Sequence, residues 1–383
     1  MFTIVGEETM PLDSYENFAS LVEPDRVHKA CYADEKVFEA ELENIFYKSW
    51  IYVGHESQIP NPGDYWTTWI GKERVIFCRA EDGKVHVLFN RCAHRGALLC
   101  NNQHGNVAKA FRCPYHAWQY NMDGSLRNVP LKKGYEGIIE LNDPQLQLQR
   151  PARQETYRGF VFASLAEQGP SLDEWMGQGA RSAFDDICNR SPEGECEIVM
   201  NCFRIIQHSN WKIFLENQLD AVHPSVTHHS TGDAAAQEQK IYKEKTGEDP
   251  PIGYQFLADF TLPIEKWDQF YTVGHPYGHT VLSGYMNLRP RDPVTVAHED
   301  ALTKAYGKER MDEILSTNVH HVLVYPCLSV QPPLQQLRAI RPLAANKTLT
   351  EIWHFRLKGA PEGVYDRSLQ YYYHVNSPST MVN

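Results

Sequence analysis

The spacing of apolar and polar positions along the chain predicts both strands and helices. Residues 34–50 place apolar side chains at helical spacing after the acidic turn that begins at Asp34, so we expect a helix there. Three runs of β-branched and aromatic residues follow, with a Glu-Asp-Gly-Lys turn between the last two. The predicted strands are residues 65–70, 75–79 and 85–89. They indicate a small antiparallel β domain that ends near residues 160–165.

The pattern of apolar and polar residues changes after the turn-forming residues 167–170. A helical stretch containing Trp175 and Met176 comes first, and the polar segment 233–251 predicts an exposed helix and loop. Alternating strands return later, followed by a helix from Pro361 through residues 371–374. These strands are residues 319–324, 335–340 and 349–357. The pattern predicts an α+β fold, with one domain over residues 45–165 and a helix-on-antiparallel-sheet domain built from residues 1–44 and 166–383.

Composition narrows the class of protein. The chain has 383 residues, of which 42% are hydrophobic, which is ordinary for two or three globular domains. No run approaches the roughly 18 apolar residues that span a bilayer, and no leader pattern opens the chain, so we expect a cytoplasmic protein away from membranes. Most of the nine cysteines are scattered, which predicts reduced thiols, and the net charge of -11 argues against nucleic acid as a partner.

The most specific chemistry lies in two short segments that each supply one cysteine and one histidine. Cys92-x-His94 is followed, after eighteen residues, by Cys113-x-x-His116. In a Rieske [2Fe-2S] cluster two cysteines hold one iron and two histidines the other, so this pattern predicts a one-electron centre. Gly96 allows close backbone approach beside the first pair. Structural zinc is the alternative, but common zinc modules group cysteine with cysteine and histidine with histidine.

A second group of metal-binding residues follows the pattern Asp220-x-x-His223-x4-His228. The two imidazoles of this segment, together with a carboxylate from elsewhere in the chain, would form the iron(II) face that leaves positions open for dioxygen. The pair alone is a weak signal, but beside an electron-carrying cluster it gains a function as the centre that consumes electrons. Pro224 is expected to end a helix and to separate the two histidines.

Together these segments resemble the α subunit, the large catalytic subunit, of Rieske non-haem iron aromatic ring-hydroxylating oxygenases. The likeness covers nearly the whole chain and is carried by residues 90–98, 113–130 and 210–228. It implies a Rieske domain over residues 45–165 and a catalytic mononuclear iron domain over the remainder. The implied cluster ligands are Cys92, Cys113, His94 and His116, with Trp118 beside them, and the implied ligands of the mononuclear iron are His223 and His228.

The resemblance also assigns roles around the mononuclear iron. An aspartate at the position of Asp220 bridges an iron-binding histidine to a cluster histidine of the neighbouring subunit, so Asp220 is the expected electron relay and Asn217 a further catalytic candidate. An ordinary carboxylate that orients a ligand is the alternative. The family takes its third iron ligand from a C-terminal aspartate, which would fall just beyond Asn383. Asp366 and Glu362 are the nearest acids and lie earlier in that helix.

The implied reaction uses NADH-derived electrons and dioxygen to hydroxylate or dihydroxylate an aromatic ring. A ferredoxin or an NADH-dependent reductase would supply the electrons, and the implied assembly is α3 or α3β3 with a possible β subunit. An O- or N-demethylating monooxygenase is the alternative enzyme, and a non-catalytic Rieske carrier is the alternative without chemistry of its own.

Two sets of basic residues bear on recognition. Arg338 lies in a predicted strand that in relatives lines the pocket, and its guanidinium suits bidentate pairing with an aromatic carboxylate; an ion pair within the strand is the alternative. Basic residues also cluster in the two predicted cluster-binding loops. A docking patch for an acidic electron donor is one interpretation, and ordinary solvated loop charge is the other. This set is Arg91, Arg95, Lys109 and Arg112.

Overall fold

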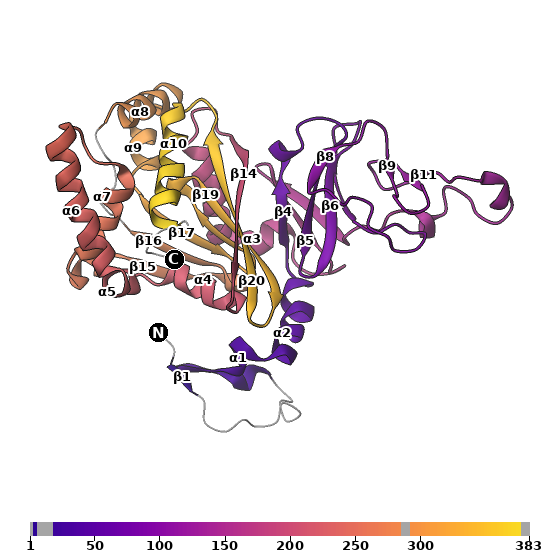
Figure 1. The fold of residues 1–383 in the computed structure, drawn as a ribbon, viewed down its shortest axis with the longest axis horizontal. Coiled ribbons are helices and arrows are strands. Elements are labelled where there is room, and N and C mark those ends of the chain that lie inside the picture. Colours follow the sequence, from indigo (N-terminus) through magenta and orange to yellow (C-terminus); the bar gives the residue numbers. More distant parts are fainter. Residues whose placement is uncertain (1–2, 6–17, 285–291, 377–383) are drawn as a thin grey trace. The chain divides into compact units, whose positions relative to one another are not determined.

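The computed structural model describes residues 3–5, 18–284 and 292–376, which fall into two compact units. The first unit contains the chain up to Leu172 together with residues 208–210 and 341–348, and the second contains residues 173–207, 211–340 and 349–383. Figure 1 shows strands as the main element of the first unit, and a large sheet with helices in the second. No helix in the described ranges is long and apolar enough to cross a membrane.

The first unit is built from small antiparallel sheets, as the alternation predicted (Figure 1). A four-stranded sheet in the order β7-β6-β5-β8 consists of Asp64–Ile70 (β5), Glu73–Arg79 (β6), Val85–Phe89 (β7) and His104–Asn106 (β8). A second consists of Phe111–Arg112 (β9), Gln119–Tyr120 (β10) and Leu126–Asn128 (β11), and a third of Ile51–His55 (β4), Arg153–Tyr157 (β12) and Phe160–Ser164 (β13). The loops β7–β8 and β9–β10 carry the two Cys/His motifs.

The chain before β4 also belongs to the first unit, which differs from the prediction that residues 1–44 join the catalytic domain. Asp34 accepts backbone N–H groups at the start of α2 (Glu35–Glu41), and a π turn then ends the helical segment at Phe46 rather than at residue 50. Lys72, in the β5–β6 turn, lies 2.5 Å from Glu39 and over the Phe38 ring, which ties α2 to the small domain. The other elements of this segment are Thr3–Val5 (β1), Val22–Glu23 (β2), Arg26–His28 (β3) and Ala30–Ala33 (α1).

The second unit is centred on a seven-stranded sheet in the order β14-β20-β19-β18-β17-β16-β15. Strands β15 to β19 pair antiparallel with their neighbours. The predicted strands are confirmed as β17, β19 and β20, whereas β14, β15, β16 and β18 were not predicted. The strands are Cys196–Gln207 (β14), Tyr271–Gly274 (β15), Thr280–Gly284 (β16), Val319–Val324 (β17), Leu328–Gln331 (β18), Gln336–Ala344 (β19) and Lys347–Leu357 (β20).

Helices complete the second unit, and α7 contacts both α6 and α10 (Figure 1). The predicted helix after Pro361 is confirmed as α10, which a π turn extends to Asn376. The polar segment 233–251 is confirmed as mostly exposed helix, because α6 runs through it to Thr246. The helices are Leu172–Asn189 (α3), Trp211–Leu219 (α4), His223–Thr227 (α5), His229–Thr246 (α6), Ile252–Ala258 (α7), Pro293–Tyr306 (α8), Lys308–Ile314 (α9) and Glu362–Tyr371 (α10).

Candidate functional site

The two Cys/His motifs converge in the first unit. The imidazoles of His94 and His116 lie with ring centroids 4.7 Å apart, and the side chains of Cys92 and Cys113 are both buried. The His94 Nδ1 atom is buried without a hydrogen-bond partner in the described part of the chain, as expected of a nitrogen that faces a metal. Two thiols and two imidazoles therefore gather as the donor set of a Rieske cluster requires.

Backbone and side-chain contacts hold these loops in shape. The buried Asn90 side chain accepts the N–H groups of Leu99 and Cys100 and donates to the Cys100 carbonyl, which closes the first loop around Cys92. Gly96 donates to the Cys92 carbonyl with φ +70°, a conformation that favours glycine. The first predicted ligand pair therefore sits on a loop whose shape is fixed by its own residues.

Aromatic side chains pack behind the cluster ligands. The Trp118 ring stacks on the His94 ring at 4.8 Å with an interplanar angle of 2°. The Tyr120 hydroxyl accepts the N–H of Ala93 and lies 3.2 Å from the Cys92 sulfur. Because that oxygen already accepts from Ala93, its own proton is free to point at the sulfur.

The residues present fit the implied Rieske cluster, and His223 and His228 are two of the three protein ligands that the mononuclear iron would need. In the described ranges, no set of three or more His, Cys, Asp or Glu side chains surrounds a single metal position. A Rieske cluster does not need such a set, because each of its irons takes only two protein ligands.

The second predicted site forms around helix α5. His223 begins this helix and His228 follows its last residue, and their ring centroids are 5.5 Å apart. Pro224 lies in the first turn of α5, so the prediction that it ends a helix was wrong. Proline is tolerated there because the first N–H groups of a helix lack intrahelical partners. Burial lowers the pKa of His228, which favours the neutral imidazole that metals bind.

Asp220 and Asn217 contact the two sides of the His223 ring. One Asp220 oxygen accepts the backbone N–H groups of Val222 and His223, at 2.8 and 3.2 Å, and the other lies 3.5 Å from His223 Nδ1. The Asn217 amide lies 3.2 Å from His223 Nε2. The nearby Asp220 oxygen and the Asn217 amide both favour the tautomer with its proton on Nδ1. In this structure the Nε2 lone pair faces the Asn217 amide, so an iron bound at Nε2 would take the place of that contact.

Neither of the nearest C-terminal acids joins this pocket. Glu362 is exposed and pairs with Arg356 at 2.6 Å, and Asp366 is exposed on α10. The expected aspartate beyond Asn383, like residues 377–383, lies outside the described residues.

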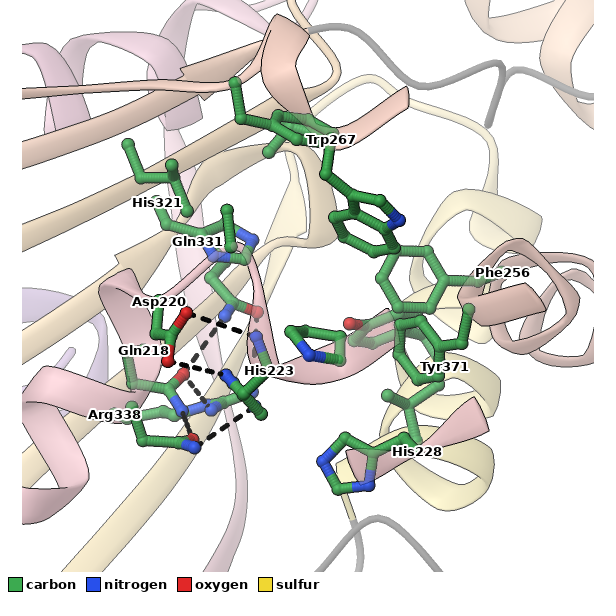
Figure 2. A pocket seen from close by; sticks show the side chains of 18 residues that line it. Gln218, Asp220, His223, His228, Phe256, Trp267, His321, Gln331, Arg338 and Tyr371 are labelled. Atoms are coloured by element: carbon green, nitrogen blue, oxygen red, sulfur yellow. Dashed lines mark hydrogen bonds and ion pairs between the residues drawn. The ribbon is translucent and has the colours of Figure 1, made fainter. Parts of the chain in front are cut away.

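His223 and His228 open onto a cavity of about 130 Å³ whose lining includes several aromatic side chains (Figure 2). An apolar cavity of about 150 Å³ is known to hold benzene, so the space suits one aromatic ring. The apolar lining residues are Ala221, Pro224, Phe256, Phe260, Trp267, Phe270, Leu282, Val319, Tyr371 and Val375, and the polar ones include Asn217, Gln218, Asp220, His321, Gln331 and Arg338.

Arg338, on β19, is the cation of this cavity and is only 3% exposed. Its Nε donates to Gln336 at 2.8 Å, and its other nitrogens donate to the side-chain oxygens of Gln218 and Gln331. Within the described ranges no carboxylate pairs with it, so the alternative of an ion pair in the strand is not what the structure shows. Burial lowers the pKa of Arg338 to about 10, which leaves the side chain charged at neutral pH.

Sequence reasoning missed the other polar residues of the cavity. His321 on β17 lines it, and burial lowers the pKa of this histidine to about 4, so it is a neutral imidazole. Gln218 is adjacent to the predicted Asn217, and its place in that motif was the available signal. Gln331, on β18, also lines the cavity and carried no signal in the sequence.

The four basic residues of the predicted docking patch are exposed on the first unit, and none forms an ion pair in the described part of the chain. We call Arg91, Arg95, Lys109 and Arg112 the basic patch. Tyr115, 62% exposed, lies on the same loop as Cys113, with its ring centroid 3.7 Å from that of His116. The surface around the cluster loops is thus cationic with one exposed aromatic ring.

Comparison with known proteins matches residues 49–144 to the Rieske [2Fe-2S] domain. Toluate 1,2-dioxygenase subunit alpha from Pseudomonas putida is 31% identical, over 89% of this chain and 73% of the relative. Anthranilate 1,2-dioxygenase large subunit from Acinetobacter baylyi is 33% identical, over 84% and 67%. A solved structure of naphthalene 1,2-dioxygenase with indole in the active site is 27% identical, with a TM-score of 0.76 over 96% of this chain and 79% of that one.

Proposed function

The chain belongs to the α subunits of Rieske ring-hydroxylating dioxygenases, and from this premise we propose that its substrate is a single-ring aromatic carboxylate. Its class as an oxidoreductase, its ring hydroxylation and its two iron cofactors follow from the family. When bound, the cluster would supply single electrons, and the mononuclear iron(II) would supply a site for dioxygen activation. The residues of this chain bind the ring, orient it and keep water away from it.

We assign the metal ligands to the residues that converge in each unit. Cys92, Cys113, His94 and His116 hold the cluster. His223 and His228 hold the mononuclear iron, oriented by Asp220, which also serves as the relay residue toward a cluster. The buried Nδ1 of His94 and the contact between Asp220 and His223 Nδ1 support these roles.

One observation carries the choice of substrate: the guanidinium of Arg338 is buried in the cavity wall with neutral partners only. A buried charge is costly unless it is paired, and removing it from water costs several kcal/mol. The three glutamine oxygens orient the guanidinium but leave its charge uncompensated. A carboxylate on the bound ring would supply the missing charge and pair with the planar fork.

The rest of the cavity suits the ring that carries this carboxylate. Its volume of about 130 Å³ fits one six-membered ring, and Phe256, Phe260 and Trp267 give it aromatic walls. His223 and His228 lie on the same cavity, so a ring bound there is next to the proposed iron. Toluate and anthranilate, named in two relatives, are single-ring acids of this kind.

Turnover of matched acids and amides tests the substrate class. The purified oxygenase, supplied with NADH and a reductase, should hydroxylate benzoate-type acids at least about 100-fold better in kcat/KM than the corresponding amides, because a buried pair that loses one partner costs about 3–5 kcal/mol. Arg338→Met should abolish this preference by slowing the acid only, whereas Arg338→Lys should keep part of it.

Arg356→Met is the matched control, because Arg356 is a partly exposed arginine on β20 that pairs with Glu362 and does not line the cavity. It should leave the acid-to-amide ratio unchanged. Equal handling of acid and amide by the parent, or an unchanged ratio in Arg338→Met, would overturn the carboxylate assignment. Counting the oxygen atoms gained by the product separates dioxygenation from monooxygenation.

As an oxygenase component, the chain needs an electron donor. We propose that an acidic ferredoxin or reductase docks on the basic patch beside the cluster loops, since complementary charge steers such encounters. An α3 or α3β3 assembly would bring the cluster of one subunit near the iron of the next. Sedimentation of the purified protein, alone and with a co-expressed β subunit, tests the assembly.

A further inference from the structure

Two aromatic side chains separate the substrate cavity from a second one. Phe256 and Tyr371 line both cavities, and the second measures about 140 Å³. We propose that this pair, which we call the aromatic wall, limits the substrate to one ring, and that shortening either side chain joins the cavities into a site for a two-ring acid. That the substrate is an acid rests on the proposed function, whereas the limit on its length rests on the two cavities alone.

The aromatic wall is one side chain thick. Phe256 comes from α7 and Tyr371 is the last residue of α10, and their rings meet edge to face with centroids 4.9 Å apart. Tyr371 is 4% exposed, and Phe256 is partly buried and also packs against Phe260. Because the same two rings line both cavities, these two side chains are enough to separate one cavity from the other.

Close backbone packing keeps the wall in place. At Gly253, one helical turn before Phe256, a Cβ atom would lie 2.5 Å from the Cβ of His374, so only glycine allows this approach. His374 belongs to the π turn that directly follows Tyr371. The two wall residues are therefore carried by segments that cannot slide apart without losing this contact, which makes the wall a fixed partition.

The second cavity has room for an apolar ring. Much of its lining is apolar, and its main charged and polar groups already have partners: Arg367 pairs with Asp292 and donates to Thr295, and His298 contacts the Arg190 carbonyl at 2.8 Å. A ring that enters would therefore not need to break these contacts. The apolar lining residues are Ile252, Phe256, Leu315, Pro333, Leu334, Val364 and Tyr371.

The two cavities are arranged so that one elongated acid could occupy both of them. Figure 2 shows Arg338 and Gln218 on one side of the substrate cavity and Phe256 and Tyr371 on the other. A carboxylate held at Arg338 thus directs the far end of its ring toward the aromatic wall. A second ring attached at that far end would meet Phe256 and Tyr371 in the parent and enter the second cavity once either is shortened.

The experiment compares benzoate with biphenyl-4-carboxylate on the iron-loaded oxygenase. Calorimetry gives the ratio of the two dissociation constants, and product analysis gives turnover of the longer acid. In Phe256→Ala and Tyr371→Ala the ratio should shift by about tenfold or more toward the longer acid, as burial of an added phenyl ring predicts. Leu334→Ala, which enlarges only the second cavity, should keep the parent ratio.

The outcomes separate the two proposals. If the parent binds benzoate and both wall variants keep the parent ratio, the wall inference is overturned while the proposed substrate class stands. If no aromatic acid binds to the parent, the substrate class fails, and the same ratio measured with benzene and biphenyl still decides the wall. Should Tyr371→Ala fail to fold, the ratio measured for the less buried Phe256→Ala decides between these outcomes.

Discussion

Replacing Tyr120 with phenylalanine removes one hydroxyl from behind the proposed cluster and nothing else. The Tyr120 side chain is fully buried, its oxygen lies 3.2 Å from the Cys92 sulfur, and it accepts the N–H of Ala93. A hydrogen bond to a cluster sulfur stabilises the reduced, more negative state more than the oxidised one. Tyr120→Phe should therefore lower the reduction potential of the cluster.

The size of the shift follows from the strength of that one contact. A hydrogen bond to a charged acceptor contributes about 1.5–3 kcal/mol, and if roughly half of it differs between the redox states, the difference is about 1 kcal/mol. For a one-electron couple, 59 mV corresponds to about 1.4 kcal/mol, so the potential should fall by about 40 mV. The lost partner of the Ala93 N–H should also destabilise the fold by about 1 kcal/mol.

Redox titration followed by low-temperature spin resonance measures this potential directly. Tyr135→Phe is the matched control, because the Tyr135 ring packs edge to face on Trp118 at 6.1 Å and has no contact with a ligand sulfur among the interactions described. That variant should keep the parent potential. A Tyr120→Phe protein whose cluster assembles and titrates within about 10 mV of the parent would refute the hydrogen bond to sulfur.

Three further predictions concern other parts of the chain. Asp220→Asn should keep both metals by elemental analysis yet lower turnover by about 100-fold or more, since a carboxylate behind a metal-bound histidine orients that ligand; full activity would remove the relay role. Lys109→Glu together with Arg112→Glu should slow cluster reduction in stopped-flow assays and weaken its salt dependence, and an unchanged rate would show the basic patch to be solvated loop charge. Burial lowers the pKa of His279 to about 4, so the contribution of the neutral imidazole to the free energy of unfolding should be complete above pH 6.5 and fall by about 3 kcal/mol as the pH drops toward 4. The melting temperature of His279→Gln should therefore fall less steeply with decreasing pH than that of the parent, and an equally steep fall would contradict this.

The cluster could be predicted from the sequence because its chemistry is local. Each ligand pair spans three or four residues, and the turn residue Gly96 lies directly beside one of them. The strands β5, β6 and β7 could also be predicted, since each is a short run of β-branched and aromatic residues and the hairpin turn between β6 and β7 contains Gly83. Local signals of this kind survive folding unchanged.

The substrate cavity could be predicted only in part, because its polar residues meet through pairing of distant segments. Arg338 was recognised from its strand, but its partner Gln218 lies 120 residues earlier, and register within the sheet brings Gln331 to it. The aromatic wall joins helices α7 and α10, and no periodicity links residue 256 to residue 371. Pro224 was misread because proline stops one helix and starts another equally well.

The use of glutamine around Arg338 decides what the cavity can select. Gln336 accepts from Arg338 with its oxygen and reaches His354 Nε2 with its nitrogen at 3.1 Å. Burial lowers the pKa of His354 to about 3, so this imidazole stays neutral, and its Nε2 can accept from the amide, which fixes the orientation of Gln336 and hence of the guanidinium. An aspartate or glutamate at any of these positions would hold the guanidinium as firmly but would cancel its charge. Carboxamides position the cation and leave its charge for the ligand, so selectivity for acids arises from the absence of a protein carboxylate among the described neighbours of Arg338.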